Sequence, residues 1–414
     1  MKLGIIGGGA AGLMAAVSAY EVNPRAVIFI LDKNDGWGKK VIISGGGRCN
    51  VTTGLPNIKT VLTKYPRGGK FLSSAMRLFP PAEVYAWFEK HGVALKIEND
   101  GRVFPVSDQG QDIVAVFEKI FQAPSFRTRL KTPVVEVTKT EHGFSLNLKN
   151  NSEPVLVDKL ILTCGGQAYR QTGSSGDGYA FALNLGHTIT PLAPSLSALT
   201  TKDSWPAEVA GLSLTKAKLT ANHDKKLSTV GPCLFTHHGL SGPAVFALSS
   251  LIAFIPFNAD HPLELSLDAL PDKSAAELMA EVEKFKTDNL KKSLVNALAS
   301  LTAKSLAQIL CQQLKLDGDK HSAEVSSHDL RLAVNWLKAI PLQITGRRAG
   351  DEFVTAGGVN LKEVDPKTMQ SKICPDLYLA GEILDIDGFT GGFNLQAAWC
   401  TGRLAGQNAA QANG

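Results

Sequence analysis

Short apolar runs alternate with glycine-rich turns at both ends of the chain. Residues 3–6 and 26–31 are apolar and bounded by turn residues, which is typical of buried strands. A stretch of small residues through Tyr20 separates the two runs and predicts a helix. This order predicts a β-α-β unit. Residues 159–163 form another apolar run, which ends at two glycines and predicts a further buried strand.

Periodic patterns fill the segment between these strands. Residues 81–91 and 109–122 carry apolar side chains at helical spacing and predict amphipathic helices. Residues 132–138 and 143–149 predict the two strands of a hairpin. A glycine-rich loop over residues 36–54 precedes them.

The texture of the sequence changes after Pro191, which predicts an inserted domain. Residues 191–272 contain short strand-like segments rich in turn residues, whereas residues 273–339 are rich in Lys, Ala and Leu at helical spacing. We therefore expect an α/β protein whose main domain is discontinuous. The expected divisions are a main domain of residues 1–190 and 341–414, an inserted β-rich domain of residues 191–272 completed by part of 330–345, and a helical subdomain of residues 273–339.

Composition places the chain among ordinary globular proteins. Of its 414 residues, 44% are hydrophobic and 20% are charged, and the longest apolar run falls short of a membrane span. The six cysteines form no C-x-x-C pair, which favours reduced thiols and no metal site, so we expect a cytoplasmic protein. The net charge of +5 permits an anionic partner, RNA included, but does not require one. The oligomeric state stays open.

The first glycine cluster carries the strongest chemical signal. Gly7, Gly9 and Gly12 follow the first predicted strand and open the first predicted helix. This spacing allows a tight turn, a close backbone approach to a pyrophosphate and close packing of helix on sheet. Asp32 lies 20 residues after Gly12, where a carboxylate can accept hydrogen bonds from ribose hydroxyls. The motif predicts a dinucleotide site but does not separate FAD from NAD.

Further glycine-rich segments favour FAD. In the loop that contains Gly45 and Gly46, Lys40 and Arg48 are candidates to neutralise phosphate charge. A second segment turns at Gly165-Gly166 and approaches a helix through Gly176-Asp177-Gly178, with Asp177 expected near its N-cap.

The last glycine-rich segment predicts the flavin end of the site. Glu382 is placed to accept hydrogen bonds from the ribityl hydroxyls. A helix that starts near Asn394 would point its N-terminus at the flavin edge where negative charge develops on reduction.

At these residues the sequence resembles the BaiN/RdsA-like family of NAD(P)/FAD-dependent oxidoreductases, a branch of the two-dinucleotide-binding-domain flavoproteins. The similarity is carried by GIIGGGAAGLMAA, SGGGRCNVTT, GRVFPVSDQ, TCGGQAYRQTGSSGDGYAFALNLGH, LFTHHGLSGPAV, TAGGVNLKEVDPKTMQSK and GEILDIDGFTGGFNLQAAW. The resemblance implies a Rossmann-type FAD domain, an inserted β-barrel-like domain and a small helical part.

The resemblance and the motifs together imply a set of cofactor contacts. The expected FAD-binding residues are Gly7, Gly9, Ala10, Ala11, Gly12, Asp32, Lys33, Lys40, Ser44, Gly45, Gly46, Arg48, Asn50, Val135, Gly165, Gly166, Gly381, Glu382, Asp385, Gly392, Asn394, Leu395 and Gln396. The backbone near Val135 is expected to pass under the adenine.

The chemistries known in this family differ, so the resemblance implies the cofactor better than the substrate. Some members reduce carbon–carbon double bonds in steroid-like molecules or in a uracil base of ribosomal RNA, and others resemble amine oxidases. Our leading hypothesis is an enzyme whose FAD is reduced by NADH or NADPH and passes the hydride to an unsaturated substrate, such as a uracil base in ribosomal RNA. Because no second GxGxxG is present, we expect the nicotinamide to bind only transiently. The alternatives are an amine or amino-acid oxidase that uses O₂ and a non-catalytic FAD-binding protein.

Reduction of a carbon–carbon double bond needs a proton donor as well as a hydride. Cys49, beside Arg48, is one candidate, although packing in its loop explains it equally well. His237 is the other candidate, with His238 beside it, although a hydrogen-bonded loop histidine is the commoner case. The pair Arg347-Arg348 is better explained as a solvated surface than as a phosphate contact.

Overall fold

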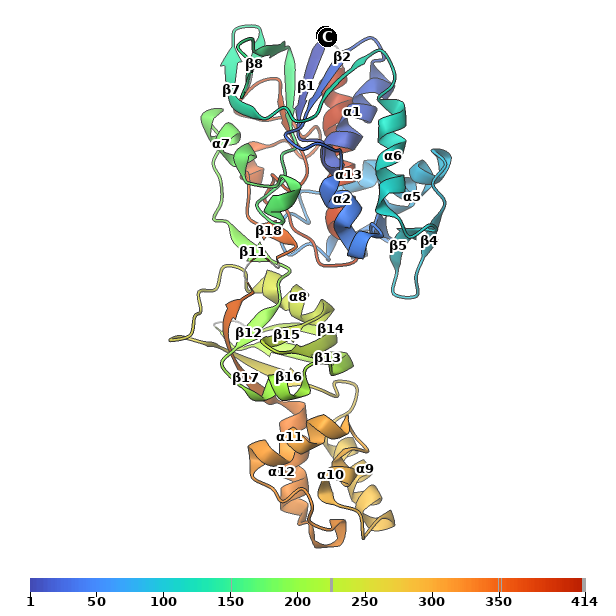
Figure 1. The fold of residues 1–414 in the computed structure, drawn as a ribbon, viewed down its shortest axis with the longest axis vertical. Helices are drawn as coiled ribbons and strands as arrows, with labels where there is room; N and C mark the ends of the chain where they lie inside the picture. Colours follow the sequence, from blue (N-terminus) through green and yellow to red (C-terminus); the bar gives the residue numbers. More distant parts are fainter. Residues whose placement is uncertain (150, 224–225, 349, 351, 412–414) are drawn as a thin grey trace. The chain divides into compact units, whose positions relative to one another are not determined.

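The computed structural model describes residues 1–149, 151–223, 226–348, 350 and 352–411. It divides into two compact units, one of Met1–Ser195 with Glu352–Gly414 and one of Leu196–Asp351. The first unit is therefore built from both ends of the chain, as Figure 1 shows by its blue, green and red colours.

A parallel sheet forms the centre of the first unit. Its strands lie in the order β19-β10-β1-β2-β6, and every neighbouring pair is parallel. The strands are β1 (Lys2–Ile6), β2 (Val27–Leu31), β6 (Phe126–Arg129), β10 (Lys159–Leu162) and β19 (Leu377–Leu379). Four of the five lie where the sequence is richest in buried Leu, Ile and Val, as expected for a sheet covered on both faces.

Three smaller sheets complete the first unit. A meander of β7 (Val134–Thr140), β8 (Gly143–Leu148) and β9 (Val155–Val157) packs over Gly4, whose Cα lies under Val157 and Leu146. In the second sheet, β5 (Arg102–Pro105) lies between β3 (Thr52–Thr53) and β4 (Leu95–Ile97). The third sheet pairs β11 (Ala193–Ser195) with β18 (Val354–Ala356).

Helices surround these sheets and begin close to the predicted positions. The predicted amphipathic helices are α5 (Pro81–Lys90) and α6 (Gly110–Ile120). The remaining helices of this unit are α1 (Ala10–Val22), α2 (Lys39–Ile43), α3 (Ile58–Leu62), α4 (Ser73–Leu78), α7 (Asp177–Asn184) and α13 (Phe393–Ala410).

The contact between α1 and α13 joins the two ends of the chain, and the two helices lie side by side (Figure 1). A Cβ atom on Gly402 would lie 2.3 Å from the Ala11 carbonyl oxygen, and one on Gly406 would lie 2.1 Å from that of Ala15. Only glycine permits backbones to approach so closely. Because the paired numbers rise together, the two helices are parallel.

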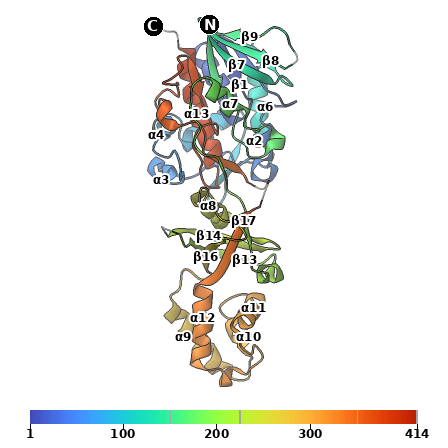
Figure 2. The ribbon, with the colours of Figure 1, turned by 90° about the vertical axis from the view of Figure 1, so that its left-hand side faces the viewer.

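The second unit is a closed barrel with helices appended. Its strands run in the order β12-β15-β14-β13-β16-β17. They are β12 (Leu199–Thr201), β13 (Ser213–Ala221), β14 (Leu227–Thr236), β15 (Gly239–Ser241), β16 (Leu263–Asp268) and β17 (Ile340–Arg347), with α8 (Pro243–Leu251) between β15 and β16. The helices α9 (Ala275–Asp288), α10 (Leu294–Leu298), α11 (Lys304–Leu314) and α12 (Ser327–Lys338) gather at one end of the barrel (Figures 1 and 2).

Two expected divisions differ from this arrangement. Residues 341–347 belong to barrel strand β17, so the C-terminal part of the first unit begins at Glu352 and not at 341. The helices of residues 273–339 share one hydrophobic core with the barrel, since Leu278 and Leu330 pack in the same cluster as Leu265. The barrel and the helices therefore form one compact unit. Among the described residues, no helix is long and apolar enough to cross a membrane.

The close contact of α1 with α13 generates a stability prediction. We expect Gly406→Ala to lower the melting temperature by about 2–10 °C, because an added methyl group at a filled contact costs ~1–3 kcal/mol. Gln407→Ala, at the neighbouring and partly exposed position, is the control and should change stability by less than about 0.5 kcal/mol. Thermal unfolding followed by circular dichroism measures both, and equal melting temperatures would contradict the contact.

Candidate functional site

The first predicted glycine cluster forms an open cradle in front of α1. The N-cap residue Gly9 has no side-chain cap, and a Cβ atom on it would meet nothing within 4 Å. Gly12, in contrast, packs so tightly that its Cβ would lie 1.9 Å from the Gly7 carbonyl oxygen. The first turn of α1 therefore presents unbonded N–H groups and the positive end of the helix dipole to an open space, which suits a pyrophosphate.

Asp32 follows β2 directly and lies beside this cradle. Its carboxylate is buried and accepts hydrogen bonds from the backbone N–H of Gly8 at 2.6 Å and of Asn34 at 2.7 Å. Because each carboxylate oxygen can accept more than one bond, capacity remains for ribose hydroxyls. The Asp32 carbonyl accepts from the Thr132 N–H, which brings the segment before β7 to the same edge. Val135 follows there at a bulge and is exposed, so its backbone is free of the regular ladder.

Two predicted lysines form ion pairs within the protein. Lys33 pairs with Asp177, the first residue of α7, at 2.5 Å and thereby links β2 to α7. Asp177 thus lies one residue inside its helix, where Gly176 is the N-cap. Lys40 pairs with Glu382 at 2.7 Å, and both side chains are largely buried. The structure therefore brings the predicted phosphate ligand Lys40 and the predicted ribityl ligand Glu382 together.

Glu382 has a second anchor that the sequence did not indicate. Its Oε1 accepts from the Thr355 N–H at 2.9 Å, and the Thr355 hydroxyl accepts from Gln167 N–H at 2.7 Å. Gly166 permits this approach, because a Cβ atom there would lie 2.5 Å from Thr355 Oγ1. Thr355 precedes a Gly-Gly pair in the β18 segment, but nothing in that pattern names Glu382 as its partner.

The N-terminus of α13 is the second uncapped helix end of the site. Gly392 is the N-cap residue, and no side chain caps the first turn. The Asn394 side chain clamps the preceding loop through two bonds of 2.8 Å to the Gly388 backbone. The Gln396 side chain is fully buried and bonds Thr52 Oγ1 at 2.6 Å and the Phe79 carbonyl at 2.8 Å. These two amides therefore shape the helix start, and the expected contacts of Asn394, Leu395 and Gln396 with the cofactor stay predictions. Leu395, between the two amides, is partly buried and packs on the core.

The two helix ends are offset along a common direction. Gly402 of α13 packs on Ala11, which is the second residue of α1, whereas it is nine residues after Phe393, where α13 begins. At 1.5 Å per residue, the start of α13 lies about 12 Å beyond the start of α1. The two positive helix ends therefore suit separate points along one extended ligand, and Gly381 packs against Ala11 at the start of α1.

The loop Ser44–Gly47 has an unusual backbone. Gly45, Gly46 and Gly47 all have positive φ, at 59°, 73° and 90°, and Gly46 and Gly47 face open space. Ser44 donates to the Val41 carbonyl, and Asn50 accepts from the Val103 N–H at 3.3 Å. The predicted loop thus exposes three glycines between two anchored ends.

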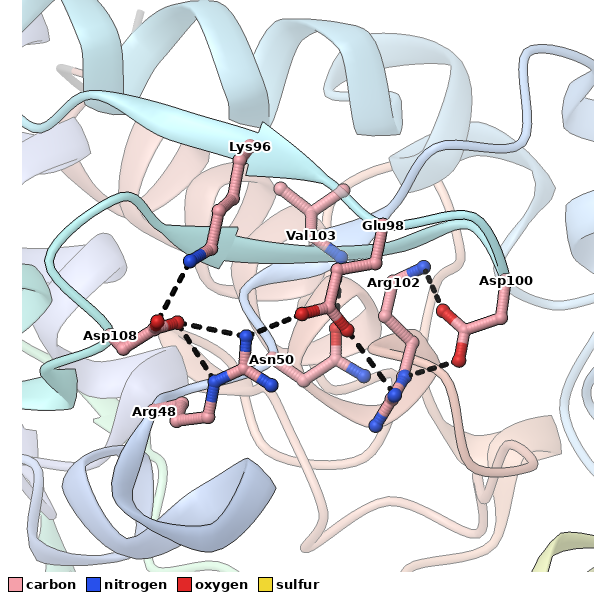
Figure 3. Close-up of polar contacts among 8 residues, drawn as sticks. All are labelled: Arg48, Asn50, Lys96, Glu98, Asp100, Arg102, Val103 and Asp108. Carbon is pink, nitrogen blue, oxygen red and sulfur yellow. Dashed lines mark hydrogen bonds and ion pairs between the residues drawn. The ribbon is translucent and has the colours of Figure 1, made fainter.

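Arg48 does not present a free charge to this loop. Its guanidinium pairs with Glu98 and, at 2.8 Å, with Asp108 (Figure 3). These carboxylates raise the pKa of Arg48, and Lys96 and Arg48 lower the pKa of Asp108. The charge of Arg48 is therefore already matched within the protein, and its expected contact with a phosphate stays a prediction.

The loop before α13 and helix α7 each hold a buried polar atom that lacks a partner within the described part of the chain. Asp385 Oδ1 and the Tyr179 hydroxyl are buried, and neither has a hydrogen-bond partner among the described residues. Burial raises the pKa of Asp385, and the Arg67 charge opposes this shift only in part. Burial, then the charges of Glu382 and Asp385, raise the pKa of Tyr179. Tyr179 directly follows the predicted Gly176-Asp177-Gly178 turn, which is the sequence signal that could have identified it.

The two catalytic candidates have different surroundings. Cys49 is fully buried with φ at 60°, and burial raises its pKa to about 12. A thiol that is closed to solvent and protonated to this pH favours the packing role. His237 and His238 are exposed in the turn between β14 and β15 of the second unit. Within the described ranges, no cluster of His, Cys, Asp or Glu could hold a metal ion.

The geometry and the family comparison agree. A family model described as the HI0933-like protein Rossmann domain matches residues 1–408. The chain belongs to this family. It is an FAD-dependent oxidoreductase with a Rossmann-type FAD-binding fold, and the resemblance recognised in the sequence is confirmed.

Relatives and solved structures are similar over nearly the whole chain. The chain is 31% identical to a 3-dehydro-bile acid delta(4,6)-reductase of Clostridium scindens, with 99% of both chains covered. It is 30% identical to a ribosomal RNA dihydrouridine synthase of Escherichia coli, with 98% of this chain and 96% of the other covered. The FrdA chain of the E. coli quinol fumarate reductase shares the fold, with a TM-score of 0.51, 15% identity, and coverage of 99% and 70%.

The environment of Cys49 generates a chemical prediction. We expect Cys49→Ala to keep its flavin and to retain turnover within about twofold, because a buried, protonated thiol acts as a small packing group. In the wild-type protein, iodoacetamide at pH 8 should modify Cys49 only after unfolding in denaturant, as measured by peptide mass spectrometry. A large loss of turnover in a variant with full flavin content would contradict this.

Proposed function

We propose that this protein uses FAD, reduced by NADH or NADPH, to saturate a carbon–carbon double bond of its substrate. The observation that carries the cofactor assignment is the pair of uncapped helix N-termini, offset by about 12 Å along one direction at the carboxyl edge of a parallel sheet. The fit is supported by open space at Gly9, Gly46 and Gly47. The unpartnered Oδ1 of Asp385 and hydroxyl of Tyr179 supply unused polar contacts in the same unit.

Each part of the site suits one part of an extended dinucleotide. The first turn of α1 would hold the pyrophosphate, and Asp32 the ribose hydroxyls beside the Val135 backbone. The Lys40–Glu382 pair offers both a donor and an acceptor to the ribityl hydroxyls. The α13 N-terminus and the exposed Ser44–Gly47 loop would adjoin the ring system. When bound, FAD would supply hydride transfer, and the protein would supply binding, orientation and protons.

The proposed reaction balances with one nicotinamide. NAD(P)H gives up a hydride and becomes NAD(P)⁺, and the substrate takes up that hydride at one alkene carbon and a proton at the other. The proton comes from a protein acid that is restored from solvent. Asp385 suits this role better than Cys49. Burial raises the pKa of this carboxyl above its ordinary value and its Oδ1 has no other partner among the described residues, whereas the Cys49 thiol is fully buried and, with a pKa of about 12, gives up its proton reluctantly.

The names of two relatives support this choice of reaction. A delta(4,6)-reductase and a dihydrouridine synthase both add hydrogen across a conjugated carbon–carbon bond, although one substrate is a steroid acid and the other a base in ribosomal RNA. We propose a conjugated alkene of one of these two kinds as the substrate, including a uracil base in ribosomal RNA. An oxidase of amines and a non-catalytic flavoprotein are the alternatives that the following experiment separates.

Anaerobic spectroscopy tests the proposal. The purified protein should show the absorbance bands of oxidised flavin, and titration with NADH or NADPH under argon should bleach them. A delta-4,6 keto steroid or unmodified ribosomal RNA should then restore the oxidised spectrum before air is admitted. Bleaching by an amine followed by rapid reoxidation in O₂ would favour an oxidase, and a flavin that no donor reduces would favour a binding protein.

A variant of Gly9 tests the cradle. We expect Gly9→Val to lose flavin, with a dissociation constant raised by more than about tenfold, since its side chain would occupy the pyrophosphate position. The surrounding protein has room for this side chain, so circular dichroism and the melting temperature of the flavin-free form should stay close to wild type. Full flavin content in the variant would contradict the proposed cofactor position.

The Asp385 carboxyl generates a pH prediction. Its raised pKa means that the proton is held at low pH and lost as the pH rises through that pKa, so substrate reduction should slow toward high pH. In Asp385→Asn this dependence should disappear and substrate reduction should be slow at every pH. Flavin reduction by NAD(P)H, followed separately by stopped flow, should remain near wild type. A variant that keeps the wild-type pH profile would exclude Asp385 as the proton source.

A further inference from the structure

The charged side chains around Arg48 form a continuous series of ion pairs beside the β3-β5-β4 sheet (Figure 3). This series is called the ion-pair network below. Asp108 bridges Arg48 and Lys96, with both nitrogen–oxygen distances at 2.8 Å. Glu98 bridges Arg48 and Arg102. Asp100 completes the network through Arg102 at 2.7 Å. Three cations face three anions, so the network is neutral as a whole.

The network meets the glycine loop through one aromatic ring. The guanidinium carbon of Arg48 lies 3.9 Å from the centroid of the Phe104 ring, which is fully buried. Gly45 also lies against this ring, because a Cβ atom added to it would come within 2.9 Å of Phe104 Cε1. Phe104 therefore contacts both Arg48 and the start of the glycine run.

The glycine loop needs such a support. Three consecutive glycines with positive φ have many accessible conformations, so fixing one of them costs more backbone entropy than in other residues. Gly46 and Gly47 have no side chain that could make stabilising contacts. Order must therefore come from the ends of the loop. There the Cys49 N–H donates to the Ser44 carbonyl at 2.8 Å, and Arg48 pairs with Glu98 in the β4–β5 turn and with Asp108 after β5.

We propose that Arg48 is a positioning residue whose ion pairs with Asp108 and Glu98 hold the Ser44–Gly47 loop in the shape that receives the flavin. Glu98 and Asp108 thus act on cofactor binding without touching the cofactor. This inference rests on the proposed function, since it takes FAD as the occupant of the loop.

The proposal and a phosphate-binding role for Arg48 predict opposite effects of one substitution. If Arg48 held a phosphate, Asp108→Asn would free its charge and strengthen FAD binding or leave it unchanged. If Arg48 holds the loop, Asp108→Asn weakens FAD binding. Asp100→Asn is the matched control, because it makes the same change within the same ion-pair network but contacts Arg102 and not Arg48.

The experiment uses full-length holoenzyme and measures FAD release on dilution by the recovery of flavin fluorescence. We expect Asp108→Asn to raise the FAD dissociation constant about two- to fivefold, the range for an ion pair of partly exposed side chains. Asp100→Asn should match wild type, and Asp108→Glu should restore most of the affinity. The effect of Asp108→Asn should shrink in about 0.5 M salt, because salt screens exposed charges.

A spectroscopic readout separates positioning from general stability. The visible circular dichroism of bound flavin should change in Asp108→Asn and not in Asp100→Asn, whereas a purely stabilising network would lower the melting temperature of both and leave the flavin signal alone. Unchanged or tighter FAD binding in Asp108→Asn overturns the loop-positioning role. A wild-type protein without flavin overturns the proposed function itself, so the two failures are distinguishable.

Discussion

The close backbone contact between α1 and α13 is the constraint on which the rest of the site depends. Gly402 and Gly406 let the C-terminal helix lie against Ala11 and Ala15 with no side chain between the backbones. This contact fixes the direction and the offset of the two helix N-termini at once. A dinucleotide site with two positive ends therefore results from packing between the termini of the chain. The chain leaves the first unit after Ser195 and returns to it at Glu352.

Local patterns allowed the sequence to predict the main-chain part of this site. Three features are defined by residues close together in the sequence: the glycine spacing after β1, the acid after β2 and the helices rich in small residues. They can therefore be predicted without a structure. The side-chain part was less predictable. The sequence did not indicate that Arg48 and Gln396 bind Glu98 and Thr52, because these partners lie 50 and 344 residues away. A residue type shows which bonds a side chain can make, but long-range folding decides which partner it finds.

The domain boundary shows the same limit for an element of secondary structure. The apolar alternation of Ile340–Arg347 is typical of a strand, but it does not show which sheet the strand joins. In the structure it closes the barrel between β12 and β16. The helices before it were expected to form a helical subdomain, because the sequence changes there to Lys, Ala and Leu at helical spacing. Their apolar faces pack into the barrel core, since short amphipathic helices cannot bury enough surface by themselves.

Two acids in the loop before α13 show how environment divides similar residues between roles. Asp387 is fully buried, forms a bidentate ion pair with Arg67 and accepts from Ser195 Oγ at 2.7 Å. Asp385, two residues earlier, has no such direct partner for Oδ1 among the described residues, and burial raises its pKa. A cation that compensates one carboxylate stabilises its charge, while the neighbouring carboxyl remains easier to protonate because the Asp387 charge opposes its ionisation. In this loop Asp387 therefore holds Ser195, at the end of β11, whereas Asp385 is the acid that we propose as the proton source.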